Sequence, residues 1–249
     1  MIDSEGPQTQ SQVMTIAEHL SDLRVRLITT AYILLGGFAL CYGFSEYIFN
    51  FLRDPIVPYL PAADKGLHFT GPFEKFMAHM KVSFLAGVIL TSPLWLYQIW
   101  KFIAPGLYLK EKKYAAGFVF SGISLFVGGS AFAYYVVLPF AFKFLLGFGG
   151  TTDTPMITIS EYIDFILKFF LAFGITFELP VILVFLGIMG VIDHQFLIKN
   201  RRYAIVVLAV ISAVVTPPDA LSMLALLIPL VILYEISVVL VRVLTRKTT

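Results

Sequence analysis

The sequence is poor in charge for its 249 residues, since Asp, Glu, Lys and Arg together make up only 14% of it. Hydrophobic residues make up 58%, and the mean hydropathy is +0.85. A soluble domain of this size has too little interior to hide so much apolar surface. The net charge of +2 is too small to indicate a nucleic-acid partner. The composition therefore excludes an ordinary soluble domain and indicates a protein of the lipid bilayer.

Residues that carry catalysis or bind metals are also scarce. The single cysteine, Cys41, lies in an apolar run, so no disulfide can form within the chain. No Gly-rich phosphate loop precedes a Lys-Ser/Thr pair, and no nucleophile has a nearby base. The histidines lack metal-ligand spacing with Cys41 or with one another; they are His19, His68, His79 and His194. We therefore predict that the protein is not an enzyme and needs no metal or cofactor.

Long apolar runs dominate what is present. A hydrocarbon core of about 30 Å needs roughly 20 helical residues. The first run is too long for the core of a cleaved signal peptide, so we expect it to be retained. We predict an all-α integral membrane protein with one domain, in which residues 1–14 are disordered. Its six expected spans cover about 27–49, 80–100, 114–138, 165–189, 203–216 and 220–241.

Basic residues are distributed unequally between the two sides of these spans. Of the 18 Lys and Arg residues, 12 fall on the side that carries both termini and the two short loops. The positive-inside rule therefore predicts that both termini are cytoplasmic. The halves of the sequence show no repeat, which disfavours a transporter built from inverted repeats.

The last two expected spans are unusually short. The run "YAIVVLAVISAVVT" has 14 residues, about 21 Å of helix, and "PPD" then reverses the chain. In the return helix, Glu235 lies two turns before Arg242, on the same face. If Glu235 marks the cytoplasmic interface, the apolar part of this helix, 221–234, is equally short. Both helices would then favour a locally thinned bilayer.

Two carboxylates lie next to expected spans in basic surroundings. Asp22, in "EHLSDLRVRL", lies off the apolar face that Leu20, Leu23 and Leu27 form at helical spacing. Glu111 lies among three lysines in the first short loop. Each carboxylate could be a solvated charge or part of an intrachain ion pair. Each could also be offered to an incoming guanidinium.

Glu178 lies near the middle of an apolar run, "LKFFLAFGITFELPVILVFLGIMG", and a carboxylate within a membrane is costly and usually marks a functional path. It could face a cavity, or it could be a protonated carboxyl bonded to a carbonyl that Pro180 frees. Pro93 and Pro229 interrupt two other spans, and we expect all three prolines to kink their helices into a concave surface.

Four motifs in order carry a family resemblance: "HLSDLRVRL", "QIWKFIAPGLYLKEKK", "AFGITFELPV" and "TPPD". Together they resemble the TatC family, the multispanning subunit of the twin-arginine protein translocase, over nearly the whole chain. The resemblance implies a glove-like bundle of six helices in the bacterial inner membrane. It implies a receptor for paired-Arg signal peptides of folded proteins, with TatA and TatB as single-span partners and the proton-motive force as the energy source. It leaves self-assembly of the chain open.

The resemblance also implies roles for individual residues. The signal-peptide-binding residues would be Asp22, Arg24, Phe102, Pro105, Tyr108 and Glu111. The intramembrane residues that contact a partner would be Glu178, Thr216, Asp219 and Met223. Pro55 matches a family proline at the start of the first external loop. The sequence departs from the family at Asp22, where Glu is more usual, and at Met223, where some relatives have Gln.

Two other classes of function are compatible with the composition. One is a proton-coupled carrier of small solutes that uses Glu178 as its proton site. The other is a structural scaffold without a transport role. The absent repeat disfavours the carrier, because many carriers are built from inverted repeats. The short final helices also disfavour it, because they suit a thinned membrane better than a sealed alternating gate.

Overall fold

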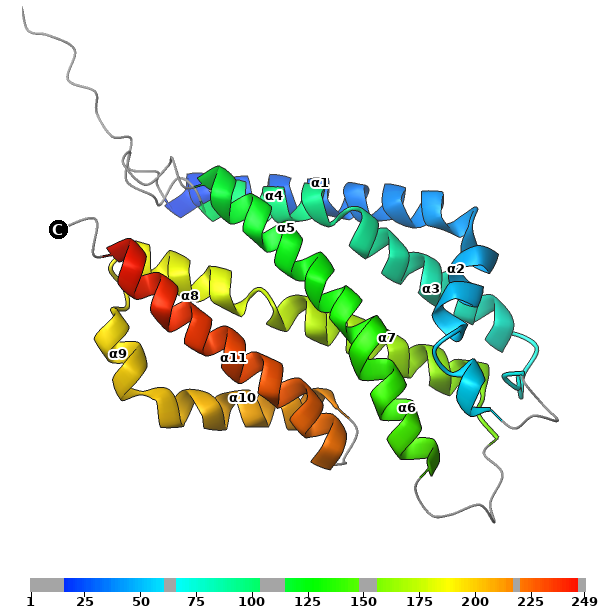
Figure 1. The fold of residues 1–249 in the computed structure, drawn as a ribbon. Coiled ribbons are helices and arrows are strands. Elements are labelled where there is room, and N and C mark those ends of the chain that lie inside the picture. The colour runs from blue at the N-terminus through cyan, green and yellow to red at the C-terminus, as the bar shows by residue number, and fades with distance from the viewer. Residues whose placement is uncertain (1–15, 61–65, 104–114, 148–155, 217–219, 246–249) are drawn as a thin grey trace, which may run out of the picture.

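The computed structural model describes residues 16–60, 66–103, 115–147, 156–216 and 220–245, and these residues are helical apart from their connections (Figure 1). One isolated bridge joins His68 to Thr158. The expected disorder of 1–14 and the site residues Pro105, Tyr108, Glu111 and Asp219 lie outside these ranges. The predicted all-α class is confirmed.

The first helix, α1 (Ile16–Tyr42), begins well before the expected span and packs against α3 (Glu74–Leu90). The two backbones approach closely at Gly37 and Gly87, because a Cβ at Gly87 would lie 2.7 Å from the backbone nitrogen of Phe38. Such small residues are typical of helix contacts in membranes, where close packing replaces the hydrophobic effect. A short helix, α2 (Ser45–Arg53), follows α1 after a break.

The second span is broken. Helix α3 ends at Leu90, α4 (Ser92–Ile103) begins two residues later, and the two are bent by 57°. Pro93 stands at the start of α4, as expected for a proline that cannot continue the preceding helix. One carbonyl near the break, that of Val88, accepts a hydrogen bond from Trp95 Nε1 at 2.9 Å.

The third span is long and continuous. Helix α5 (Ala115–Phe132) passes through a π-helical segment, η4 (Ala133–Val137), into α6 (Leu138–Gly147). The stretch from Ala116 to Gly147 has 32 residues, about 48 Å of helix. In Figure 1 it crosses the molecule diagonally in green. Because it exceeds a core of about 30 Å, it has to tilt or extend beyond the lipid.

The fourth span consists of α7 (Ile159–Thr176) and α8 (Leu179–Ile188), with Pro180 at the second position of α8. Its inner face carries much of the core, where Phe169 and Phe173 of α7 are almost completely buried together with Phe126 of α5. On the side of the molecule opposite the termini, α2 is hydrogen-bonded to α7. There Tyr162 Oη donates to the Leu52 carbonyl of α2 at 2.5 Å.

The chain ends in a short helix, α9 (His194–Lys199), and a hairpin of α10 (Arg201–Val215) and α11 (Ala220–Thr245). Helix α10 has 15 residues, about 22 Å. Helix α11 continues through Pro229 without a break, so that proline does not divide its helix. Arg201 Nη2 lies 2.7 Å from Glu235 Oε2, which puts Glu235 level with the start of α10.

Within the described residues, four helical stretches are long and apolar enough to cross a membrane, and the bent pair α3–α4 adds a fifth. Helix α10 is the shorter sixth element of the fold class. Pro55 is half-buried in the turn between α2 and a single 3-10 turn, η1 (Val57–Tyr59). The starts of α1 and α5 and the ends of α4, α8 and α11 lie at the same side of the molecule (Figure 1). The molecule is a multi-pass membrane protein.

Candidate functional site

The described part of the predicted signal site lies where α1 meets α4. His19, Asp22 and Arg26 follow one another at spacings of three and four residues, so they share one face of α1. The His19 ring stacks on Phe102 of α4, with ring centroids 4.4 Å apart. We call these four residues the α1–α4 junction. Two motifs about 80 residues apart are therefore brought together there.

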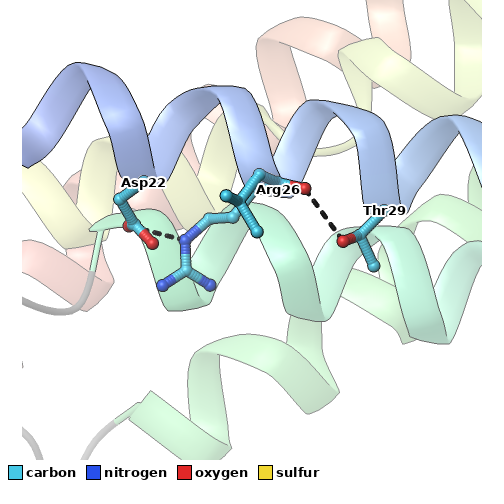
Figure 2. A network of polar contacts seen from close by, with 4 residues as sticks. Asp22, Arg26 and Thr29 are labelled. Atoms are coloured by element: carbon cyan, nitrogen blue, oxygen red, sulfur yellow. Dashed lines mark hydrogen bonds and ion pairs between the residues drawn. The ribbon is translucent and has the colours of Figure 1, made fainter.

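Asp22 is held by its own helix. Its Oδ2 lies 2.7 Å from Arg26 Nε, and 25% of the Asp22 side chain and 15% of the Arg26 side chain are exposed. Figure 2 shows the pair along α1, and the Thr29 hydroxyl donates to the carbonyl of Val25, one turn before it. Of the possibilities open for Asp22, the intrachain ion pair is the one observed. Arg24 is exposed outside this pair.

The apolar face of α1 points away from the bundle. Leu20 is 59% exposed and Leu27 is 61% exposed, while Arg26 is largely buried. In a membrane this orientation is favourable, because lipid accepts the leucines and the polar side chains gain protein partners. The polar face of the helix is therefore the one available to form a site with α4.

Glu178 stands at the break between α7 and α8, which we call the α7–α8 break (Phe177 and Glu178). Its Oε1 is buried, and no hydrogen-bond partner for this atom exists among the described residues. The expected alternative, a bond from the carboxyl to a carbonyl freed by Pro180, is not seen at Oε1. Burial of an unpaired carboxylate oxygen is costly. Of the two described site carboxylates, Asp22 and Glu178, Glu178 is thus the one with an unsatisfied buried oxygen.

The surroundings of Glu178 come from two other helices. A Cβ added to Gly122 of α5 would lie 3.1 Å from Glu178 Oε2 and 3.6 Å from the indole nitrogen of Trp100 on α4. The absence of a side chain at Gly122 therefore leaves room for the carboxylate. The Trp100 indole and the Glu178 carboxylate therefore both face the space next to Gly122.

An apolar cavity of about 240 Å³ lies between α5, α8 and α11, and its lining includes Pro180, two residues after Glu178. Ser121 and Pro180 line it nearest to the break, and the rest of the lining is apolar. Thr216 is buried and its hydroxyl donates to the Ser212 carbonyl within α10, while Met223 is half-buried. In the described part of the chain, no hydrogen bond joins Thr216 to Glu178.

The sequence reasoning missed an ion pair between the second and fourth spans. Lys81 Nζ of α3 lies 2.5 Å from Asp164 Oδ1 of α7, with both side chains partly exposed. Both residues fall within or beside an expected span, and opposite charges at such depths could have predicted a pair. It ties α3 to α7 on the side opposite the termini.

Fold and composition together define a multi-pass membrane protein. A model of the family "Sec-independent protein translocase protein (TatC)" matches residues 18–229. The chain is 42% identical to a TatC protein of Koribacter versatilis, over 90% of the chain and 84% of that protein. It is 41% identical to a TatC protein of Aquifex aeolicus, over 94% and 97%.

A solved structure agrees. The crystal structure titled Twin Arginine Translocase Receptor TatC matches with a TM-score of 0.79 at 40% identity, over 91% of this chain and 99% of that one. The chain belongs to the TatC family. It is a component of the Tat protein translocase, and this family is not a catalytic one.

Proposed function

We propose that the protein is the receptor subunit of a twin-arginine translocase and binds paired-Arg signal peptides of folded proteins. The observation that carries this proposal is the α1–α4 junction, which puts Asp22 and Phe102 at one end of a TatC-family bundle. We assign signal binding to Asp22, Arg24, Phe102, Pro105, Tyr108 and Glu111.

Carboxylates suit this role because of the shape of arginine. A guanidinium donates two parallel hydrogen bonds to a carboxylate, which an ammonium cannot reproduce. Two carboxylates, Asp22 and Glu111, would therefore distinguish paired arginines from paired lysines. An exposed ion pair contributes only about 0.2–1 kcal/mol. Most of the affinity then comes from the apolar part of the signal, at about 0.8 kcal/mol per buried methylene.

Glu178 would act after recognition. We propose that it meets a transmembrane helix of TatA, TatB or the signal, because its buried Oε1 lacks a partner among the described residues. Thr216, Asp219 and Met223 would complete this intramembrane contact from the last hairpin. Transport would be driven by the proton-motive force, which adds no catalytic group to the chain.

We place the protein in the bacterial inner membrane with both termini in the cytoplasm. The support is the excess of Lys and Arg on the side of the termini. The start of α1 and the end of α11 lie at the same side of the molecule (Figure 1). On this orientation, the α1–α4 junction faces the compartment in which precursors fold.

The test is copurification of a folded precursor with the detergent-solubilised protein. We expect a precursor with paired arginines to copurify, and the same precursor with paired lysines to do so much less. The double variant Asp22→Ala, Glu111→Ala should reduce capture while the protein still folds. Equal capture of both precursors would contradict the receptor role. Glu178-dependent solute uptake by liposomes would instead favour the carrier.

A further inference from the structure

The Asp22 carboxylate is not an empty receptor site, because a guanidinium of the same chain already occupies it. We propose that Arg26 is an internal competitor for Asp22, and that a signal-peptide arginine binds by displacing it. This inference rests on the proposed function and adds a residue that sets selectivity. A cationic ligand that binds Asp22 more weakly than Arg26 does would not displace Arg26.

The geometry favours the internal pair. Arg26 Nε lies 2.7 Å from Asp22 Oδ2, and the acid precedes the base by four residues, the stabilising order on a helix. Only 15% of the Arg26 side chain is exposed, so its guanidinium is held rather than freely solvated. Aspartate has a single methylene between Cα and carboxyl, which keeps the carboxylate close to its own helix. The described residues add no second donor to it.

The contact is also incomplete, and this makes exchange possible. Arg26 reaches one carboxylate oxygen through Nε, whereas the strongest arginine–carboxylate contact uses two nitrogens and both oxygens. An incoming guanidinium that approaches Asp22 in this bidentate way forms a stronger contact than the single hydrogen bond from Arg26. A lysine ammonium is a point charge without that fork, so it gains little from the exchange.

Selectivity follows from the difference between these contacts. Without Arg26, Asp22 would attract any cation, because charge alone would suffice. With Arg26 in place, the site is neutral, and only a better hydrogen-bonding partner binds well. Removing Arg26 should therefore tighten the binding of signal peptides with paired arginines and of those with paired lysines. It should also reduce the ratio of their affinities.

Binding of fluorescent signal peptides to the full-length protein in nanodiscs tests the proposal. Arg26→Gln should bind the paired-Arg peptide about threefold more tightly, the size expected for release of one helix-surface ion pair. The increase in affinity of Arg26→Gln should be larger for the paired-Lys peptide. Lys101→Gln, which removes an exposed cation at the end of α4, is the matched control and should change neither. Arg26→Lys, which keeps the charge in a shorter reach, should lie between wild type and Arg26→Gln.

A double-mutant cycle separates competition from general charge. In an Asp22→Asn background, Arg26→Gln should no longer tighten binding. Equal tightening in that background, or in Lys101→Gln, would overturn the proposal. Weaker binding by both Arg26 variants would also overturn it, since Arg26 would then position Asp22 rather than compete for it. If the wild-type protein does not distinguish the two peptides, the receptor function itself fails, and that outcome is visible without any Arg26 variant.

Discussion

Asp22 and Glu178 are both carboxylates at helix junctions, but their surroundings differ. Asp22 lies at the α1–α4 junction, is a quarter exposed and is paired with Arg26. Glu178 lies at the α7–α8 break, and its buried Oε1 has no partner among the described residues. At the α1–α4 junction the carboxylate is paired within the chain, whereas at the α7–α8 break one carboxylate oxygen lacks a hydrogen bond.

The difference separates two ways of binding. At a satisfied group, a ligand gains only the difference between its own contact and the one it replaces, which favours selectivity. At an unsatisfied buried group, a ligand also relieves the cost of the missing hydrogen bond, which favours affinity. We infer that the α1–α4 junction discriminates between ligands and that the α7–α8 break stabilises an inserted helix.

The largest expected effect comes from Glu178. We expect Glu178→Leu to insert and fold but to block transport after the signal is bound, because a partner helix loses its polar contact. Hydrogen bonds between membrane helices contribute about 1–2 kcal/mol, which corresponds to roughly tenfold weaker association. Glu178→Gln keeps size and hydrogen bonding, so a milder defect than in Glu178→Leu would show that hydrogen bonding matters more than charge. Transport and signal binding are measured on the same preparations.

A cysteine probe checks access to Glu178. Because Cys41 is the chain's only cysteine and is buried, a Cys41→Ala background leaves the probe as the single thiol. We expect a cysteine at position 178 to react with a water-soluble thiol reagent. No labelling, together with full transport by Glu178→Leu, would make Glu178 a tolerated buried acid and remove the contrast between the two regions.

The next effect concerns membrane thickness near the α10–α11 hairpin. Inserting four leucines into α10 adds about 6 Å and about 1.1 turns, so its faces stay roughly in register. We expect transport to be lost and signal binding to be retained, because the α1–α4 junction lies on other helices. The matched control replaces exposed valines with leucine at constant length; these are Val206, Val207, Val210 and Val214. Full transport by the lengthened variant would show that a short α10 is not required.

Much of the fold could be predicted because lipid imposes a length on each span. The break at Pro93 could be predicted as well, since proline cannot continue a helix. Helix bounds were less accessible: α1 begins at Ile16 and α6 continues to Gly147, because a ruler for hydrocarbon thickness does not measure where backbone hydrogen bonding stops. The π-helical segment η4 was not anticipated, since a shift in hydrogen-bond register leaves no mark in composition.

The candidate sites divide in the same way. Motifs identified Asp22 and Phe102, but only the structure brings the two segments together through His19. The pairing of Asp22 with Arg26 could have been predicted from their spacing of four residues. Lys81 and Asp164 are 83 residues apart, and their pairing depends on how α3 packs against α7. Local rules predict contacts within one helix, whereas contacts between helices require the tertiary packing.

The last effect is on stability; it is smallest for Asp22, and it should have opposite signs in the two regions. Glu178→Leu should raise the free energy of unfolding, because a buried unsatisfied polar group costs about 1–3 kcal/mol. Asp22→Asn should lower it by only about 0.3–0.5 kcal/mol, the contribution of a helical ion pair at spacing of four. Thermal unfolding of both variants in one detergent measures the difference, and Glu178→Gln, which keeps a buried polar group, should gain less than Glu178→Leu. Destabilisation by Glu178→Leu would mean that Glu178 already has a favourable partner in the folded protein. The two carboxylates would then be alike, and the assignment of affinity to one region and selectivity to the other would fail.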